Sequence, residues 1–244
     1  MEASKTKACK NCDGVLLPAY KFCPQCGQSA KIKRLNLKQV RKDLLKKFLH
    51  AEMGIVYLTK ALALRPGIVA REYFEGKRKR YYEPLKYLTL SVGISVLATE
   101  YFDLMSTARA GANPVSVFVA RHLNVILMFS VPIAAFISWL FFPKKRYNYA
   151  EHLALHAFVG GFRTLFYLLI FTPLVALFRA QYNLILLLYF GAWTIYLIWA
   201  NRQLFEEPLW VVAFKTLGLV LLLQLVISLG IFVVAWVYFR QGGH

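Results

Sequence analysis

The carboxy-terminal two thirds of the chain is a series of long apolar segments, and this series constrains the fold more than any other feature. Each segment has at least about 18 residues, enough for a helix to cross roughly 30 Å of hydrocarbon. In lipid the backbone polar groups must be satisfied within the segment, so such spans form helices. The sequence predicts an all-α polytopic membrane protein of about five transmembrane helices, at about 85–102, 123–142, 153–178, 182–200 and 212–239.

Charge divides the chain into the same two parts. Residues 1–86 contain 20 of the 30 Lys and Arg residues, although the whole chain is 58% hydrophobic and only 17% charged. Soluble domains are nearer half apolar and a quarter charged. The start of the chain, Met1 to Lys5, lacks the apolar region that a signal peptide requires. We therefore expect a basic N-terminal third in the cytosol and a membrane bundle over residues 85–244.

Two Cys-x-x-Cys pairs lie near the start of the chain, at Cys9 and Cys12 and at Cys23 and Cys26. Each pair can form a knuckle with two thiolates aimed at one metal, and four thiolates are the ligand set of a structural zinc site. A module of this size cannot fold on a core of its own, so metal binding and folding should be coupled. Residues 1–30 are therefore predicted to be a cytosolic zinc ribbon that binds structural Zn²⁺.

The residues around the cysteines support two knuckles. Gly27 follows the second pair and Asp13 follows the first, where a knuckle often needs a positive φ. A cytosolic location argues against disulfides, whereas iron can use the same four thiolates and stays open. A closed set of four ligands leaves no position for catalysis. We expect the site to be covered by a hairpin with the apolar side chains of Val15, Leu16, Tyr20 and Phe22.

Residues 31–84 are predicted to be a basic segment of amphipathic and interfacial helices. Within 31–50, apolar residues recur at helical spacing among lysines and arginines, which suits a membrane surface. The apolar stretch from Ile55 to Leu64 is too short to cross a bilayer and stops at a Pro-Gly pair. We interpret this stretch as a re-entrant or interfacial helix.

A run of four basic residues precedes the first span, at Lys77, Arg78, Lys79 and Arg80. Basic residues beside tyrosines at this position fit anionic lipid headgroups. The plainer interpretation is that these charges only orient the spans. With the basic end inside, the loop holding Lys144, Lys145 and Arg146 is also cytosolic, and the C-terminus lies outside.

The predicted third span contains the polar residues most suggestive of chemistry. His152, His156 and Arg163 share one helix face, and Gly160-Gly161 suggests a break in the helix. A charge inside the hydrocarbon is costly, so Arg163 must face protein or water. The stripe could form a proton or anion path or a headgroup-phosphate site. Alternatively, Arg163 is structural, capped by backbone carbonyls or paired with Glu100.

Several of these segments together resemble a bacterial family of uncharacterised zinc-ribbon membrane proteins, similar in layout to Yip1-type multi-span proteins. The matching pieces are both cysteine pairs, Arg65-Pro66-Gly67, Arg71-Glu72-Tyr73 through Gly76-Lys77-Arg78, and Tyr82-Glu83-Pro84-Leu85. The resemblance implies zinc binding and a bacterial cytoplasmic membrane. It implies no substrate, because the family has no assigned activity.

The sequence favours a binding role over catalysis. It has no HExxH, P-loop or GxSxG motif, and its five histidines are too few for a membrane di-iron site. We expect a membrane-anchored adaptor or assembly subunit that docks a protein partner through the ribbon and basic segment. The alternatives are a transporter, channel or lipid-handling protein and, less favoured, a membrane enzyme acting on lipid. Sparse aromatics in the ribbon argue against nucleic acid, and a homo-oligomer stays open.

Overall fold

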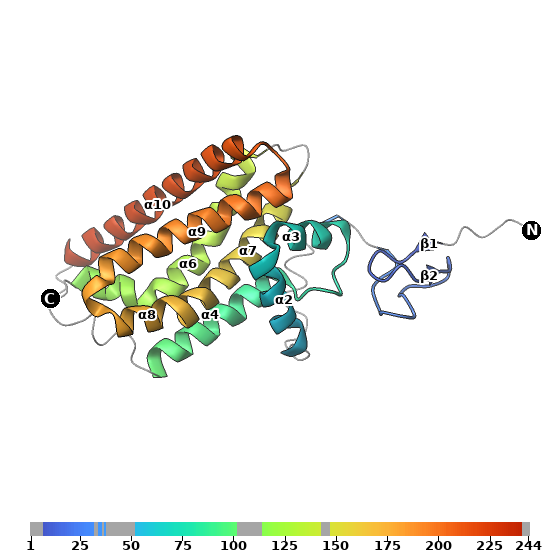
Figure 1. Cartoon of the computed structure of the whole chain (residues 1–244), viewed down its shortest axis with the longest axis horizontal. Helices are drawn as coiled ribbons and strands as arrows, with labels where there is room; N and C mark the ends of the chain where they lie inside the picture. Colours follow the sequence, from blue (N-terminus) through green and yellow to red (C-terminus); the bar gives the residue numbers. More distant parts are fainter. Residues whose placement is uncertain are drawn as a thin grey trace, which may run out of the picture.

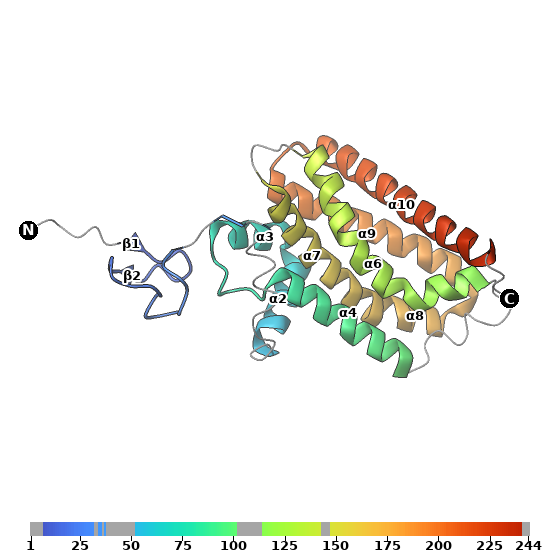
Figure 2. The same cartoon turned by 180° about the vertical axis from the view of Figure 1, so that it is seen from behind.

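The computed structural model describes residues 7–31, 34–35, 37, 52–101, 114–142 and 147–240. Two short strands, β1 (Lys7–Ala8) and β2 (Val15–Leu16), pair antiparallel in the ribbon. The remaining elements are helices, and the long ones lie side by side in one bundle in both views (Figures 1 and 2). Most of the predicted amphipathic helix of residues 31–50 falls outside the described residues.

Three helical segments are long and apolar enough to cross a membrane, judged by length and composition. They are Tyr149–Leu177, Tyr182–Phe205 and Leu209–Val234. The third belongs to α10 (Leu209–Arg240), whose apolar window is only 6% buried inside the protein. A helix that is apolar on all sides and uncovered is typical of a membrane span. These three segments indicate a membrane protein.

Two further apolar helices lie in the bundle, α4 (Pro84–Tyr101) and α6 (Pro114–Phe141). Their apolar stretches, Pro84–Thr99 and Val125–Phe141, are shorter than those of the three segments above. Within the described part of the chain, length and composition therefore identify three candidate spans, where the sequence predicts five.

A short helical hairpin lies at the end of the bundle nearest the ribbon, formed by α2 (Glu52–Leu64) and α3 (Pro66–Glu75) (Figure 1). Leu58 and Leu62 of α2 are fully buried in a cluster that includes Phe158. Gly76 ends α3 in the left-handed conformation, with φ of 114°. The hairpin is therefore packed into the bundle end.

The helix α3 meets α9 (Tyr182–Phe205) at very close range. A Cβ atom on Gly67 would lie 2.2 Å from the carbonyl oxygen of Ala200, so only glycine permits this approach. The backbone N–H of Gly67 donates to Oε1 of Gln203 at 2.9 Å. Arg71 donates to the backbone oxygens of Gln203 and Leu204 and so satisfies the carboxy-terminal end of α9.

The Gly160-Gly161 pair does not break its helix, contrary to the expectation from sequence. Both glycines lie within α7 (Tyr149–Phe166), which is continuous through them. A Cβ on Gly161 would lie 2.6 Å from Cδ1 of Tyr87, and one on Gly160 would lie 3.1 Å from Cγ2 of Val131. The pair therefore lets α4 and α6 pack closely on α7, as small residues do between membrane helices.

The departure from α-helical geometry comes nearly two turns later, at Tyr167. A π-helical turn, η1 (Tyr167–Phe171), joins α7 to α8 (Thr172–Leu177), and the 3₁₀ turn η2 (Arg179–Gln181) then leads into α9. Pro173 lies in the first turn of α8 and has no N–H to donate. Thr172 donates its N–H and its hydroxyl to the carbonyl of Tyr167. Proline and a π-turn are ordinary causes of a local change in helix geometry.

Candidate functional site

The four cysteines of the ribbon form one cluster. Their Sγ atoms all lie within 4.8 Å of one another. Cys9 Sγ lies 3.7 Å from Cys26 Sγ, and Cys12 Sγ lies 3.6 Å from Cys23 Sγ. A tetrahedral ion with metal–sulfur bonds of about 2.3 Å places its sulfurs about 3.8 Å apart. The spacing and the four thiol ligands fit a closed tetrahedral metal site.

Two backbone knuckles hold these thiols in place, as the sequence predicts. Cys9 N–H donates to the carbonyl of Gly14, and Cys23 N–H donates to that of Gln28, at 2.8 and 2.7 Å. Asp13 and Gly27 follow the second cysteine of each pair and have φ of 58° and 67°. Both positive φ values are confirmed. The backbone N–H of each of these residues donates a hydrogen bond to the carbonyl oxygen of the first cysteine of its pair.

The apolar cover of the cluster is smaller than expected. Leu16 is buried with Cys9 and Cys23. The other three side chains predicted to cover the site point outward, with exposed fractions of 63% for Val15, 40% for Tyr20 and 63% for Phe22. The prediction was therefore wrong for these three residues, because two-residue strands provide only one inward apolar position beside the cysteines. Thiols supply most of this small core.

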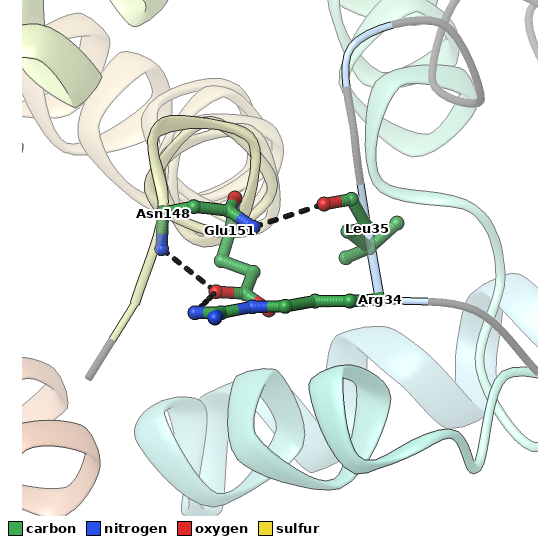
Figure 3. A network of polar contacts seen from close by, with 4 residues as sticks. All are labelled: Arg34, Leu35, Asn148 and Glu151. Carbon is green, nitrogen blue, oxygen red and sulfur yellow. Dashed lines mark hydrogen bonds and ion pairs between the residues drawn. The ribbon is translucent and has the colours of Figure 1, made fainter. Parts of the chain in front are cut away.

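Contacts from the ribbon and from the segment after it reach the helical part of the chain. Gln28 Oε1 accepts the backbone N–H of Lys79 at 3.2 Å. Arg34 forms two hydrogen bonds to the carboxylate of Glu151, of 3.0 and 2.8 Å (Figure 3). Leu35 is buried, and its carbonyl accepts Nδ2 of Asn148 at 3.0 Å. The ribbon is thus joined to the segment between α3 and α4, and its linker to the start of α7.

Glu151 has two functions at that position. It is the third residue of α7 and completes a capping box with Asn148, in which each side chain accepts the other's backbone N–H. Its side chain is only 4% exposed, so the charge needs a partner. The paired Arg34 side chain is 57% exposed. One carboxylate therefore caps the helix and binds the linker.

Replacing Arg34 with alanine is expected to loosen this contact. The variant leaves Glu151 with only its capping bonds, and because Arg34 is half exposed the loss should be about 1–2 kcal/mol. Hydrogen exchange at the first turn of α7 would measure it. Arg34→Lys keeps the charge but loses the bidentate geometry, so its exchange rate should lie between those of wild type and the alanine variant. Equal exchange in all three proteins would contradict the assignment.

The basic run beside the first span contacts acidic and aromatic side chains within the protein. Nζ of Lys77 lies 3.4 Å from Glu72, and Nη1 of Arg80 lies 3.8 Å from the same carboxylate. Arg78 lies over the ring of Tyr73, at 5.8 Å. Lys79 is exposed. Arg80 is exposed as well, and contact of this run with anionic lipid stays a prediction.

Glu72 is the centre of that charge cluster. Burial acts to raise the pKa of its carboxyl, but a hydrogen bond from Tyr81 and the nearby Lys77 and Arg80 charges outweigh it and lower the pKa. Burial and the bond to Glu72 raise the pKa of Tyr81 in turn. At neutral pH this cluster therefore pairs a carboxylate with a phenol that keeps its proton, and it holds the segment after α3 in place.

The two histidines of the predicted polar stripe are buried in the bundle. His152 Nδ1 lies 2.9 Å from Oγ of Ser138 on α6, and its ring stacks on Phe205 with centroids 5.5 Å apart. His156 is only 5% exposed. Neither Nε2 has a hydrogen-bond partner among the described residues. The pair faces protein rather than lipid.

Arg163 lies against the aromatic side chains of α9. Its Nε donates to the hydroxyl of Tyr189 at 3.0 Å, and its guanidinium lies over the rings of Tyr189 and Trp193, at 5.7 and 5.4 Å. Such cation–π contacts stabilise a charge that has left water. These partners differ from the carbonyl cap or Glu100 expected from sequence; the side chain of Glu100 is outside the described part. Two residues of the stripe, His152 and Arg163, thus contact α9 or its end.

Several contacts were not predicted from the sequence. The capping box of Asn148 and Glu151 has a local signature that could have been read, an Asn followed three residues later by Glu. The Arg34 contact has no such signal, because it joins residues 117 positions apart. The same is true of Arg71 on the end of α9, 132 positions away.

Comparison with known protein families matches part of the chain. The family described as "Protein of unknown function (DUF3667)" matches residues 52–96, which comprise α2, α3 and most of α4. No curated protein and no solved structure matches the chain. The match agrees with a resemblance to a family without assigned activity, and it gives no support for a zinc-ribbon family or a Yip1-type layout. It covers the segment that contains Gly67, Arg71 and Glu72.

Proposed function

We propose that this protein is a membrane-anchored docking protein, in which a zinc ribbon presents a binding surface to a protein partner beside the membrane. The observation that carries the proposal is the exposure of large apolar side chains on the ribbon. Val15, Leu17, Tyr20 and Phe22 are exposed on a module whose four cysteines would all be ligands of one metal ion. Exposed apolar groups on a small rigid module are typical of a contact surface, and a closed site argues against catalysis.

Zinc is the proposed metal. Four thiolates in a tetrahedral arrangement are its usual structural ligand set, and a metal without redox chemistry suits a purely structural centre. Zinc would hold the two knuckles together and so fix the positions of Val15 and Phe22. Its removal would abolish the docking surface without touching the bundle.

The membrane part is proposed to have five spans. In both views α4 and α6 run along the bundle with the other long helices (Figures 1 and 2), α4 packed against α7, and α6 against α7 and α10. The 18 residues of α4 reach about 27 Å at about 1.5 Å per residue, close to the roughly 30 Å of hydrocarbon.

The orientation follows from the position of the basic residues. The ribbon and the segment between α3 and α4, which contains Lys77 to Arg80, lie at one end of the bundle, and the carboxy-terminal end of α10 lies at the other (Figure 1). Because basic residues stay on the cytoplasmic side, the ribbon should be cytosolic and the C-terminus outside. A bacterial cytoplasmic membrane is the proposed location. Lys79 would contact its anionic lipids.

The proposal is tested by photo-crosslinking in living cells. A photoreactive phenylalanine analogue at position 22 should give a discrete crosslink to another protein. The same analogue at Lys10, an exposed polar position of the first knuckle, should not. Combining position 22 with Cys23→Ser and Cys26→Ser should remove the crosslink. No crosslink at position 22, or one unaffected by loss of the cysteines, would contradict docking through the folded ribbon.

A further inference from the structure

An apolar pocket lies between two segments of the bundle, far from the ribbon. Its volume is about 360 Å³. One wall comes from the end of α7, η1 and α8, and the other from α9. The walls include Phe166, Ile170, Phe171, Leu174, Ile185 and Leu188. No charged side chain lines it, and its polar groups are Gln181 and the hydroxyl of Tyr189.

The pocket has a fixed aromatic floor. Tyr167, Phe171 and Tyr189 form a buried cluster, with the Phe171 ring 4.9 Å from the rings of both tyrosines. Arg163 binds the hydroxyl of Tyr189 from behind, at 3.0 Å. The π-turn places Phe171 in this cluster and Ile170 at the pocket wall. Arg163 is thus a positioning residue that fixes the Tyr189 ring.

The length of the pocket matches one half of a bilayer. Along α9 it extends from Gln181, just before the helix begins, to Ala192. Eleven residues at about 1.5 Å each make about 16 Å, and half of the hydrocarbon thickness is about 15 Å. Its polar residue Gln181 lies at the outer end, where a headgroup would be. The inner end is entirely apolar apart from the hydroxyl of Tyr189, which is already bound to Arg163.

The pocket opens sideways, away from the centre of the bundle. Leu188, Ile170 and Leu174 at its walls have exposed fractions of 62%, 46% and 40%. In a membrane these side chains face hydrocarbon, so the molecule with direct access is a lipid. A chain entering from the side would lie along α9, parallel to its neighbours in the leaflet.

We propose that this pocket binds one acyl chain of a lipid from the leaflet opposite the ribbon. The lining matches a hydrocarbon chain in polarity, the length matches a single leaflet, and the opening faces the acyl chains. The aromatic floor fixed by Arg163 distinguishes the pocket from the exposed side chains of α10, because a preformed cavity holds a chain with less ordering cost than an open surface. This site is independent of the docking surface on the ribbon.

The test counts lipids that stay bound to the full-length protein. Protein reconstituted in vesicles of palmitoyl-oleoyl phosphatidylglycerol is extracted in detergent, washed and examined by native mass spectrometry. Wild type should retain one lipid per chain. Ala192→Phe fills the inner end and should reduce retention by about tenfold or more. Leu187→Phe, on the same helix but 69% exposed and outside the pocket, should retain the lipid as wild type does.

Each other result contradicts the proposal. Equal retention in Ala192→Phe and wild type, or no lipid on wild type, would rule out a chain in this pocket. If wild type binds a second copy of the protein and Ala192→Phe does not, the pocket is a contact between copies and not a lipid site. Ala192→Leu adds a smaller side chain to the pocket and controls for misfolding of Ala192→Phe. It should also lose lipid while keeping the thermal midpoint of wild type.

Discussion

Replacing Cys23 and Cys26 with serine is expected to remove the bound metal completely and to unfold residues 7–31, while the helical bundle stays folded. The buried residues of the ribbon are Cys9, Leu16, Cys23 and Gln28, and its strands have two residues each. So small a core cannot offset the chain entropy without the metal, which in ribbon-like peptides contributes about 10–16 kcal/mol of apparent binding free energy. Metal content by plasma mass spectrometry should fall from one ion per chain to none.

Trypsin provides the matching structural measurement. Lys10 and Lys21 lie in the ribbon and should become cleavable in the double-serine protein and in wild type treated with a chelator. Phe22→Ser is the control, since it removes an exposed apolar side chain and no ligand; it should keep its metal and its resistance. Metal content that survives loss of both cysteines would refute the four-thiolate site. The same spectrum distinguishes zinc from iron.

Gly67→Ala is expected to destabilise the contact between α3 and α9 severely. The new Cβ would meet the carbonyl oxygen of Ala200 at 2.2 Å, Cβ of Gln203 at 2.6 Å and the backbone nitrogen of Leu204 at 2.8 Å. Two of these three atoms are backbone and cannot move aside by a rotamer change. The loss should reach or exceed the roughly 3 kcal/mol at the top of the usual range for overpacking. The thermal midpoint should fall by roughly 6–12 °C.

Gly191→Ala is the matched control for that change. It is also a glycine of α9, but a Cβ there would meet nothing within 4 Å. Alanine is the better helix former by about 0.5–1 kcal/mol, so the midpoint should stay equal or rise slightly. If both alanine variants melt like wild type, α3 does not pack on α9 as described.

Local rules of sequence were enough to predict the knuckles. The spacing of the cysteines, together with Asp13 and Gly27, determines the thiol cluster, because each knuckle is closed by residues within a few positions of each other. The helices of the bundle were likewise predictable from apolar length. The outward side chains of Val15 and Phe22 were not, since burial depends on how much core the whole module can form.

Partners distant in sequence escaped prediction. Arg163 could be recognised as a residue that needs a partner, but nothing in the sequence selects Tyr189 and Trp193 from the many aromatics of the chain. The Gly160-Gly161 pair was misread because glycine both weakens a helix and permits close packing. The positions of Tyr87 on α4 and Val131 on α6 show that close packing is the effect of the pair here.

The contact between Arg34 and Glu151 also sets an order of events during synthesis of the chain. Arg34 leaves the ribosome 117 residues before the carboxylate that binds it. At about 5–20 residues per second, the interval is roughly 6–23 s. During that time the residues of α2, α3, α4 and α6 are synthesised, while the linker has no anchor on α7. Attachment of the linker to α7 therefore comes late, when the start of α7 has emerged and its capping box can form.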